Sequence, residues 1–142
     1  MTDCSFEFTH AITRRPARSV VDGLRAKNHG TPNFDQMLKD HAHYVATLRE
    51  TGAEIIELPA LDEFPDAVFV EDAALCLKNS AILMRLGAIS RMGEVAMMAP
   101  AIRAQFDDVS EITGPGFIEG GDILTTSREI LIGIGQNRCC RR

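Results

Sequence analysis

Long hydrophobic runs and export signals are missing from this sequence. No apolar stretch approaches the roughly 20 residues that a membrane-spanning helix needs. The first residues, MTDCSFEFTH, do not combine a basic region with an apolar one, as a secretory signal peptide does. We therefore expect no membrane partner and no export.

Regularly spaced metal and disulfide ligands are missing as well. Cys4, Cys76, Cys139 and Cys140 show no CxxC spacing, and the histidines form no HxxxH motif. We interpret the cysteines as reduced thiols of a cytoplasmic protein. Because EF-hand and P-loop spacings are also absent, we expect no metal site and no cofactor.

Positive charge is in short supply. The chain has 15 Lys and Arg against 20 Asp and Glu, which gives a formal net charge of -5. This balance argues against a nucleic-acid partner and is compatible with a cationic ligand. The 142 residues, 45% hydrophobic and 25% charged, have the composition of one globular domain. A chain of this length buries roughly two-thirds of its unfolded surface.

Carboxylates interrupt two otherwise apolar segments. FPDAVFVEDAALCL at positions 64–77 carries Asp66, Glu71 and Asp72, and FIEGGDIL at 117–124 carries Glu119 and Asp122. A buried carboxylate is costly unless it meets a cation or several hydrogen-bond donors. A flat guanidinium suits two such carboxylates, because its N–H donors are gripped bidentately. The acids therefore indicate a site for a guanidinium-like cation.

Two alternatives to a cation-binding site stay open. The acids could lie at strand ends, facing solvent or pairing with Arg85, Arg91 or Arg103. They could also hold Mg²⁺ or Ca²⁺, although EF-hand spacing is absent.

Hydrophobic periodicity predicts an α/β chain. A helix is expected from about Pro32 to Arg49, with Thr31 as its N-cap and Gly52 at its C-terminal stop. A second helix, kinked or interrupted by Pro100, is expected over residues 94–106. The predicted strands cover residues 6–13, 54–58, 67–77, 80–84, 109–112, 117–125 and 129–133.

The sequence also repeats itself. Glu71 aligns with Glu119 at an offset of 48 positions, and the same offset places residues 82–84 on residues 130–132. Each copy has an acid, a hairpin and a second apolar strand, and a helix links the copies. A period of this size is typical of stacked or circularly arranged modules, none of which covers its own apolar face.

Four motifs in this order resemble the N-terminal half of a dimethylarginine dimethylaminohydrolase, a member of the guanidino-group modifying, or pentein, superfamily. They are HAITRRPARSVVDGL, FPDAVFVEDAAL, the SRMGE loop and FIEGGDIL. The resemblance runs from about His10 to Gly135 and implies ββαβ modules of a pentein-type α/β propeller, here incomplete, about half of a five-module ring. We expect residues 1–135 to form this half and residues 136–142 a divergent tail.

The resemblance also implies a chemistry. Family members hydrolyse a methylated arginine to citrulline and an amine through a covalent intermediate on a Cys. Asp72 is expected to hold the substrate guanidinium. Glu119 is expected to be the catalytic Glu that grips the other guanidinium nitrogens and organises proton transfer.

Further roles follow from the same motifs. Asp66, Glu71 and the backbone of Leu24 are expected to support substrate binding. Arg91 is expected to clamp the α-carboxylate of the substrate, and Phe69 to line the pocket.

The catalytic His and Cys of the family lie in the second half of its members, which this sequence does not contain. Two hypotheses follow: a guanidine hydrolase half that is inactive alone, and a non-catalytic remnant that binds arginine-like cations or serves in assembly. Since about half of the ring would leave apolar surfaces and strand edges uncovered, we expect a homodimer or a higher homo-oligomer.

Overall fold

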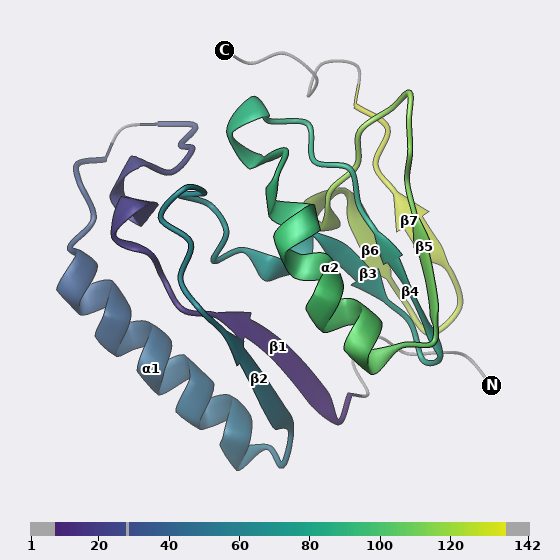
Figure 1. Ribbon diagram of the computed structural model, residues 1–142, viewed down its shortest axis with the longest axis horizontal. Helices are drawn as coiled ribbons and strands as arrows, with labels where there is room; N and C mark the ends of the chain where they lie inside the picture. The colour runs from purple at the N-terminus through teal and green to yellow at the C-terminus, as the bar shows by residue number, and fades with distance from the viewer. Residues whose placement is uncertain (1–7, 28, 136–142) are drawn as a thin grey trace. The chain divides into compact units, whose positions relative to one another are not determined.

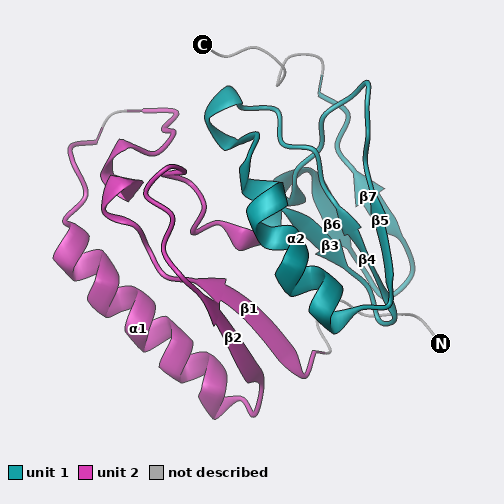
Figure 2. Ribbon diagram, in the orientation of Figure 1, with its two compact units in different colours: residues 1–7, 71–142 teal, residues 8–70 magenta. Residues whose placement is uncertain are grey.

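The computed structural model describes residues 8–27 and 29–135 (Figure 1). The predicted tail at 136–142, with its two cysteines, lies outside the described residues. The chain divides into two compact units, which within the described part comprise residues 8–70 and residues 71–135 (Figure 2). Each unit is described below by itself.

The unit of residues 8–70 is a βαβ arrangement. Strand β1 (His10–Arg14) pairs in parallel with β2 (Glu54–Leu58), and helix α1 (Phe34–Glu50) connects them and packs on β2. A short 3-10 helix, η1 (Arg18–Asp22), follows β1. Parallel pairing requires such a crossover, because the second strand must start again at the same end of the sheet.

Helix α1 begins two residues later than the sequence predicted. Its N-cap is Asn33, whose side-chain oxygen accepts a hydrogen bond from the Gln36 N–H at 3.0 Å. The predicted N-cap, Thr31, is therefore wrong, because the side chain that satisfies a free N–H of the first turn belongs to Asn33. The helix stops before Gly52, whose φ of +89° is the left-handed conformation expected there.

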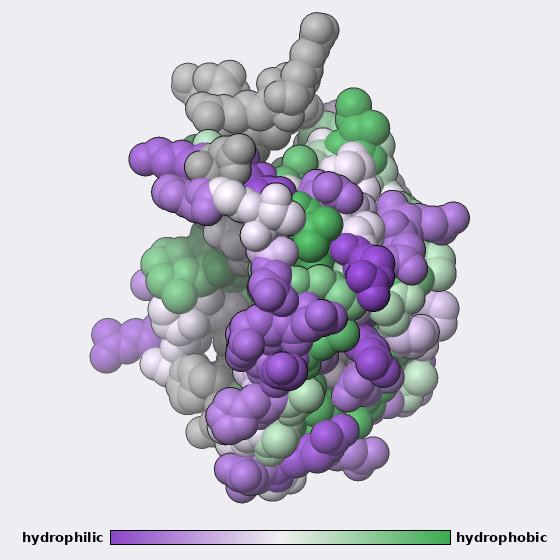
Figure 3. Space-filling view, turned by 90° about the vertical axis from the view of Figure 1, so that its left-hand side faces the viewer, coloured by the Kyte–Doolittle hydropathy of each residue, from purple (hydrophilic) through white to green (hydrophobic). Residues whose placement is uncertain are grey.

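The side of α1 that is exposed to solvent is polar. Figure 3 is taken from the side on which α1 lies, and mostly hydrophilic side chains face the viewer, with smaller hydrophobic areas between them. On the other face of the helix, Val45 is buried. Neither α1 nor any other helix in the described part of the chain is long and apolar enough to cross a membrane.

The unit of residues 71–135 contains one full ββαβ module. Strand β3 (Ala74–Cys76) pairs antiparallel with β4 (Ser80–Leu83), and β4 pairs in parallel with β5 (Asp108–Glu111). Helix α2 (Glu94–Gln105) links β4 to β5, packs on both, and continues through Pro100. The core of the module includes side chains from β4, the following segment and α2, among them Leu83, Leu86, Met98 and Ile102.

A second hairpin follows this module. Strand β6 (Ile123–Thr125) pairs antiparallel with β7 (Ile130–Ile132) as a two-stranded sheet. A single backbone bridge, from Arg85 to Ile118, joins the segments that follow β4 and precede β6.

The predicted strands over 67–77 and 117–125 are too long. Val70–Asp72 forms a 3-10 helix, η2, and Gly120–Asp122 forms another, η4, so that β3 and β6 each begin only after these turns. Acidic side chains favour such turns, because they accept hydrogen bonds from nearby backbone N–H groups that a strand would give to its neighbour. The acidic residues therefore lie in turns that immediately precede β3 and β6.

The hydrogen-bond register confirms the internal repeat and corrects its offset. Ala74 opposite Leu83 corresponds to Ile123 opposite Ile132, an offset of 49 positions instead of 48. The bonds that flank the hairpins agree: Met84 N–H to Ala73 C=O matches Gly133 N–H to Asp122 C=O. The offset of 48 was wrong because it aligned the two acids, whereas the strand ladders set the register.

Candidate functional site

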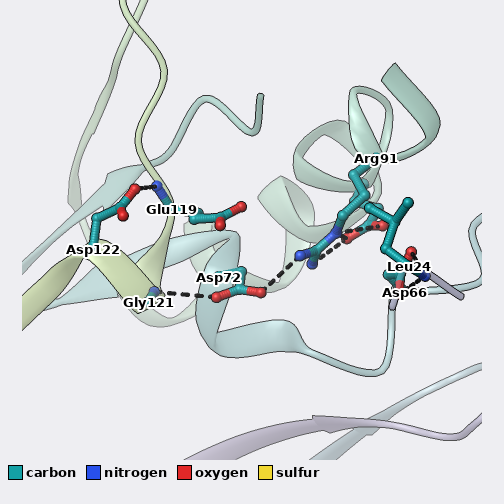
Figure 4. A network of polar contacts seen from close by, with 8 residues as sticks. Leu24, Asp66, Asp72, Arg91, Glu119, Gly121 and Asp122 are labelled. Atoms are coloured by element: carbon teal, nitrogen blue, oxygen red, sulfur yellow. Dashed lines mark hydrogen bonds and ion pairs between the residues drawn. The ribbon is translucent and has the colours of Figure 1, made fainter. Parts of the chain in front are cut away.

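A buried arginine joins two carboxylates in the unit of residues 71–135 (Figure 4). The Arg91 guanidinium donates to Asp72, with 2.7 Å between Nη1 and Oδ2. It donates to Glu94 through Nε at 3.0 Å and Nη2 at 2.8 Å, which is a bidentate arrangement. The side chains of Arg91 and Glu94 are only 7% and 4% exposed, and that of Asp72 is 18% exposed.

Local structure places these side chains. Arg91 is the last residue of a 3-10 helix, η3 (Ile89–Arg91), and Glu94 is the first residue of α2. The spacing of three positions lets the two side chains meet on one face. A carboxylate in the first turn of a helix is also stabilised by the N–H groups and the dipole there. The SRMGE loop therefore forms a short helical corner that points a guanidinium at Asp72.

The ion pairs keep Arg91 charged. Burial alone would lower the pKa of the Arg91 guanidinium, but the hydrogen bonds and charges of Glu94 and Asp72 outweigh it, and the pKa is raised. A buried charge of this kind is tolerated because it is paired and hydrogen-bonded on both sides. The three side chains together carry one net negative charge, which favours a cationic ligand.

The second oxygen of Asp72 reaches the next module. Asp72 Oδ1 accepts a hydrogen bond from the Gly121 N–H at 3.2 Å, so the turn that contains Asp72 is tied to η4. Gly120 lies against the backbone carbonyl of Glu71, where a Cβ atom would overlap the carbonyl oxygen. Only glycine permits this close approach of two backbones.

Glu119 begins the η4 turn. The Asp122 N–H donates to the Glu119 carbonyl at 2.9 Å, and the Glu119 N–H donates to Asp122 Oδ2 at 3.3 Å. Figure 4 shows the Glu119 side chain extending from this turn on the side where Asp72 and Arg91 lie. The structure thus brings the Asp72 and Glu119 segments of two successive modules together at their turns.

Leu24, Asp66 and Phe69 belong to the unit of residues 8–70, whereas Glu71 is the first described residue of the other unit. Asp66 is 4% exposed and accepts the Leu24 N–H with both carboxylate oxygens, at 3.0 and 3.2 Å. Gly23 lies against the same carboxylate, where an added Cβ would be 2.7 Å from Oδ1. Phe69 is 45% exposed, and its N–H donates to the Asp66 carbonyl. Asp66 and the Leu24 backbone were each predicted to contact the substrate, and here they are hydrogen-bonded to each other.

Sequence reasoning missed Glu94. The SRMGE motif at residues 90–94 includes Glu94, but only Arg91 was expected to have a role. The spacing of three positions between Arg91 and Glu94 at the start of a helix was the available signal. Pairing of the acids with an arginine, one of the alternatives left open, occurs between Asp72 and Arg91.

The other two arginines named in that alternative do not hold the predicted site acids through any observed ion pair. Arg85 stacks over the Phe117 ring at 4.5 Å. Arg103 pairs with Glu111 at 4.0 Å on the surface. In the described part of the chain, no group of three or more His, Cys, Asp or Glu side chains could hold a metal ion.

Comparisons with known proteins identify relatives over most of the chain. The chain is 39% identical over 127 residues to the N(G),N(G)-dimethylarginine dimethylaminohydrolase of Pseudomonas aeruginosa, covering 89% of this chain and 50% of the relative. It is 35% identical over 131 residues to the enzyme of that name from Streptomyces coelicolor, covering 88% of this chain and 49% of the relative. No family model matches the sequence. The chain spans about half the length of the curated relatives it matches.

Solved structures agree. A structure of the Pseudomonas aeruginosa enzyme, a mutant complexed with citrulline, matches with a TM-score of 0.87 at 39% identity, over 89% of this chain and 50% of that one. The N-terminal domain of a cyanobacterial arginine dihydrolase bound to its substrate matches with a TM-score of 0.76 at 21% identity, over 87% and 48%. The second match supports the pentein fold alone. The resemblance predicted from the four motifs is confirmed.

Proposed function

We propose that this chain, which is homologous to dimethylarginine dimethylaminohydrolases over about half of their length, is the guanidinium-binding half of an amidine hydrolase. The half is N-terminal, and the reaction converts a methylated arginine to citrulline and an amine. Asp72 carries the proposal. One of its oxygens accepts from the Gly121 N–H, and the other already accepts from a guanidinium, that of Arg91.

The proposed roles are those that the resemblance to the family implies. Asp72 holds the substrate guanidinium. Glu119, on the turn that contacts the Asp72 turn, grips the other guanidinium nitrogens and moves the proton. Arg91 clamps the substrate carboxylate, and Glu94 positions Arg91.

The same proposal assigns supporting contacts. Asp66, with the Leu24 backbone, and Glu71 add polar contacts to the substrate, and Phe69 lines the pocket. No cofactor or metal takes part in this scheme. The proposed substrate is a small guanidine. The protein is proposed to be cytoplasmic and to bind neither nucleic acid nor a membrane.

The chemical half of the enzyme lies elsewhere in this proposal. About half of a five-module propeller carries the carboxylates, and the remaining half supplies the catalytic His and the nucleophilic Cys. We therefore expect no turnover by the chain alone. Incubation with dimethylarginine, followed by a citrulline assay, is expected to give no citrulline above the buffer control. Citrulline production would contradict the assignment of the nucleophile to the other half.

Binding tests the site directly. Calorimetry is expected to detect saturable binding of arginine by the unsubstituted chain. Asp72→Ala is expected to abolish it, because each charge-assisted hydrogen bond contributes about 1.5–3 kcal/mol. Asp108→Ala on the exposed β5 strand is the matched control and should leave the affinity unchanged. Equal affinities for Asp72→Ala and the unsubstituted chain would count against the site, provided that circular dichroism finds both folded.

A second candidate function, an assembly module, is favoured by one observation. The β6–β7 hairpin exposes Leu124, Ile130, Leu131 and Ile132. We expect the chain by itself to form a homodimer or a higher homo-oligomer that covers them. Light scattering at micromolar concentration tests this, and a monomer would refute it.

A further inference from the structure

The segment that precedes Glu119 lies against Arg85. Arg85 follows β4, and its backbone carbonyl accepts a hydrogen bond from the Ile118 N–H at 2.9 Å. This bond belongs to the isolated bridge between the two residues. Ile118 directly precedes Glu119 in the chain. The backbone of Arg85 is therefore bonded to the residue next to the predicted catalytic glutamate.

The guanidinium of Arg85 adds contacts to the loop before Ile118. Its Nη1 donates to the Gly116 carbonyl at 3.1 Å, and its Cζ lies 4.5 Å from the centre of the Phe117 ring. A cation over an aromatic face is attracted by the ring, more strongly where solvent is partly excluded. Arg85 and Phe117 are both partly buried. One side chain thus contacts the carbonyl of one loop residue and the ring of the next.

Gly114 leaves room for this guanidinium. Its φ is +118°, a left-handed conformation that glycine adopts without strain. A Cβ atom added there would lie 2.5 Å from Arg85 Nη1. The loop therefore bends closely around the Arg85 side chain, which a surface arginine surrounded by solvent would not require.

The η4 turn is consequently held on both sides. After Glu119, the Gly121 N–H donates to Asp72 Oδ1 (Figure 4). Before Glu119, Phe117 and Ile118 are held by Arg85. The hydrogen bonds between Glu119 and Asp122 lie within the turn, so they shape the turn without placing it relative to Asp72. Only one residue separates Phe117 from Glu119, so a shift of the loop at Phe117 redirects the Glu119 side chain.

We propose that Arg85 is a positioning residue for Glu119. Its guanidinium holds the loop of residues 114–117, and the loop sets the direction in which Glu119 presents its carboxylate to the guanidinium of the ligand. This inference rests on the proposed function, in which Glu119 grips the ligand. It assigns Arg85 no contact with the ligand.

Amide hydrogen exchange without ligand tests the effect on the loop. Arg85→Met removes the cation and keeps an unbranched side chain, and the Ile118 amide is expected to exchange at least about tenfold faster in this variant. Unchanged exchange at β3 and β4 verifies that the module stays folded. If those strands also exchange faster, Phe117→Leu, which removes only the ring, takes the place of Arg85→Met. Exchange at Ile118 that stays at the rate of the unsubstituted chain would overturn the inference.

Ligand selectivity tests the effect on Glu119. The measured quantity is the ratio of the calorimetric affinities for arginine and citrulline, which differ at the group that Glu119 grips. Arg85→Met is expected to lower this ratio at least about fivefold, because a displaced carboxylate loses charge-assisted hydrogen bonds. By charge alone, losing a positive side chain would favour arginine and raise the ratio. Partial unfolding would weaken both ligands equally. Arg103→Met, which removes a surface cation of the same unit, should leave the ratio unchanged.

A double substitution shows whether Arg85 acts through Glu119. In a Glu119→Gln background, Arg85→Met is expected to leave the ratio unchanged, because the carboxylate that Arg85 positions is absent. A ratio near one in the unsubstituted chain would overturn the proposed function itself. A high ratio that Arg85→Met leaves intact, or that it lowers equally with and without the Glu119 carboxylate, would overturn this inference alone.

Discussion

Removing the Arg91 guanidinium should cost this fold far more than removing a surface arginine. Arg91 is 7% exposed and is hydrogen-bonded to Glu94 and Asp72. Arg91→Met would leave two carboxylates without their cation, one of them 4% exposed. Removing one partner of a buried pair destabilises proteins by about 3–5 kcal/mol. Because a whole domain is stable by only about 5–15 kcal/mol, most of the margin would be lost.

Arg103→Met is the matched control in the same unit. Arg103 pairs with Glu111 at 4.0 Å, with both side chains more than half exposed. Exposed pairs of this kind contribute about 0–1 kcal/mol, since solvent screens them. Urea unfolding followed by circular dichroism measures both losses, and only the Arg91 variant is expected to lose more than 1 kcal/mol.

A milder substitution keeps the prediction measurable if Arg91→Met does not fold. Glu94→Gln retains the size of the side chain and removes its charge, which should cost about 1.5–3 kcal/mol through weaker hydrogen bonds to Arg91. Losses below 1 kcal/mol for both Arg91→Met and Glu94→Gln would refute the interpretation that the buried ion pairs hold this corner together.

Three further predictions concern other sites. Burial lowers the pKa of His41 from 6.5, so the unfolded chain takes up the proton first and the free energy of unfolding should fall as pH drops below about 6.5; urea unfolding at two pH values should find less dependence in His41→Gln. Gly120→Ala forces a Cβ into the Glu71 carbonyl and should cost about 1–3 kcal/mol in urea unfolding, whereas Gly116→Ala, in open space, should cost little. Burial raises the pKa of the Cys76 thiol, so iodoacetamide should modify it more slowly at pH 8 than it modifies free cysteine, and an equal rate would contradict this.

The elements with a plain hydrophobic period were the predictable part of the fold. Strand β2 (Glu54–Leu58) has the predicted bounds, and α2 and β5 begin or end within a residue of theirs. The start of helix α1 was less predictable, because the sequence offers two candidate N-cap residues. Thr31 and Asn33 are both good N-caps, and only the position of the Gln36 N–H decides between them.

Contacts between distant segments were predictable only in part. The acids of both modules were identified, but the bond between Asp72 and Arg91 spans 19 positions, and no spacing rule reaches that far. The predicted repeat offset was wrong by one residue. The sequence alignment matched Glu71 with Glu119, whereas the hydrogen bonds between the strands match residues that are 49 positions apart. The offset that sequence similarity suggests and the offset that strand pairing sets can therefore differ, because the register depends on which residues of each strand face the core.

The central claim is that carboxylates of successive modules grip a flat cation at its N–H groups. Comparing the calorimetric affinities of arginine and citrulline tests this most directly, because the two differ only in exchanging the guanidinium for a neutral urea group. Each lost charge-assisted hydrogen bond is worth about 1.5–3 kcal/mol, so arginine should bind at least tenfold more tightly. Equal affinities for the two ligands would contradict the claim.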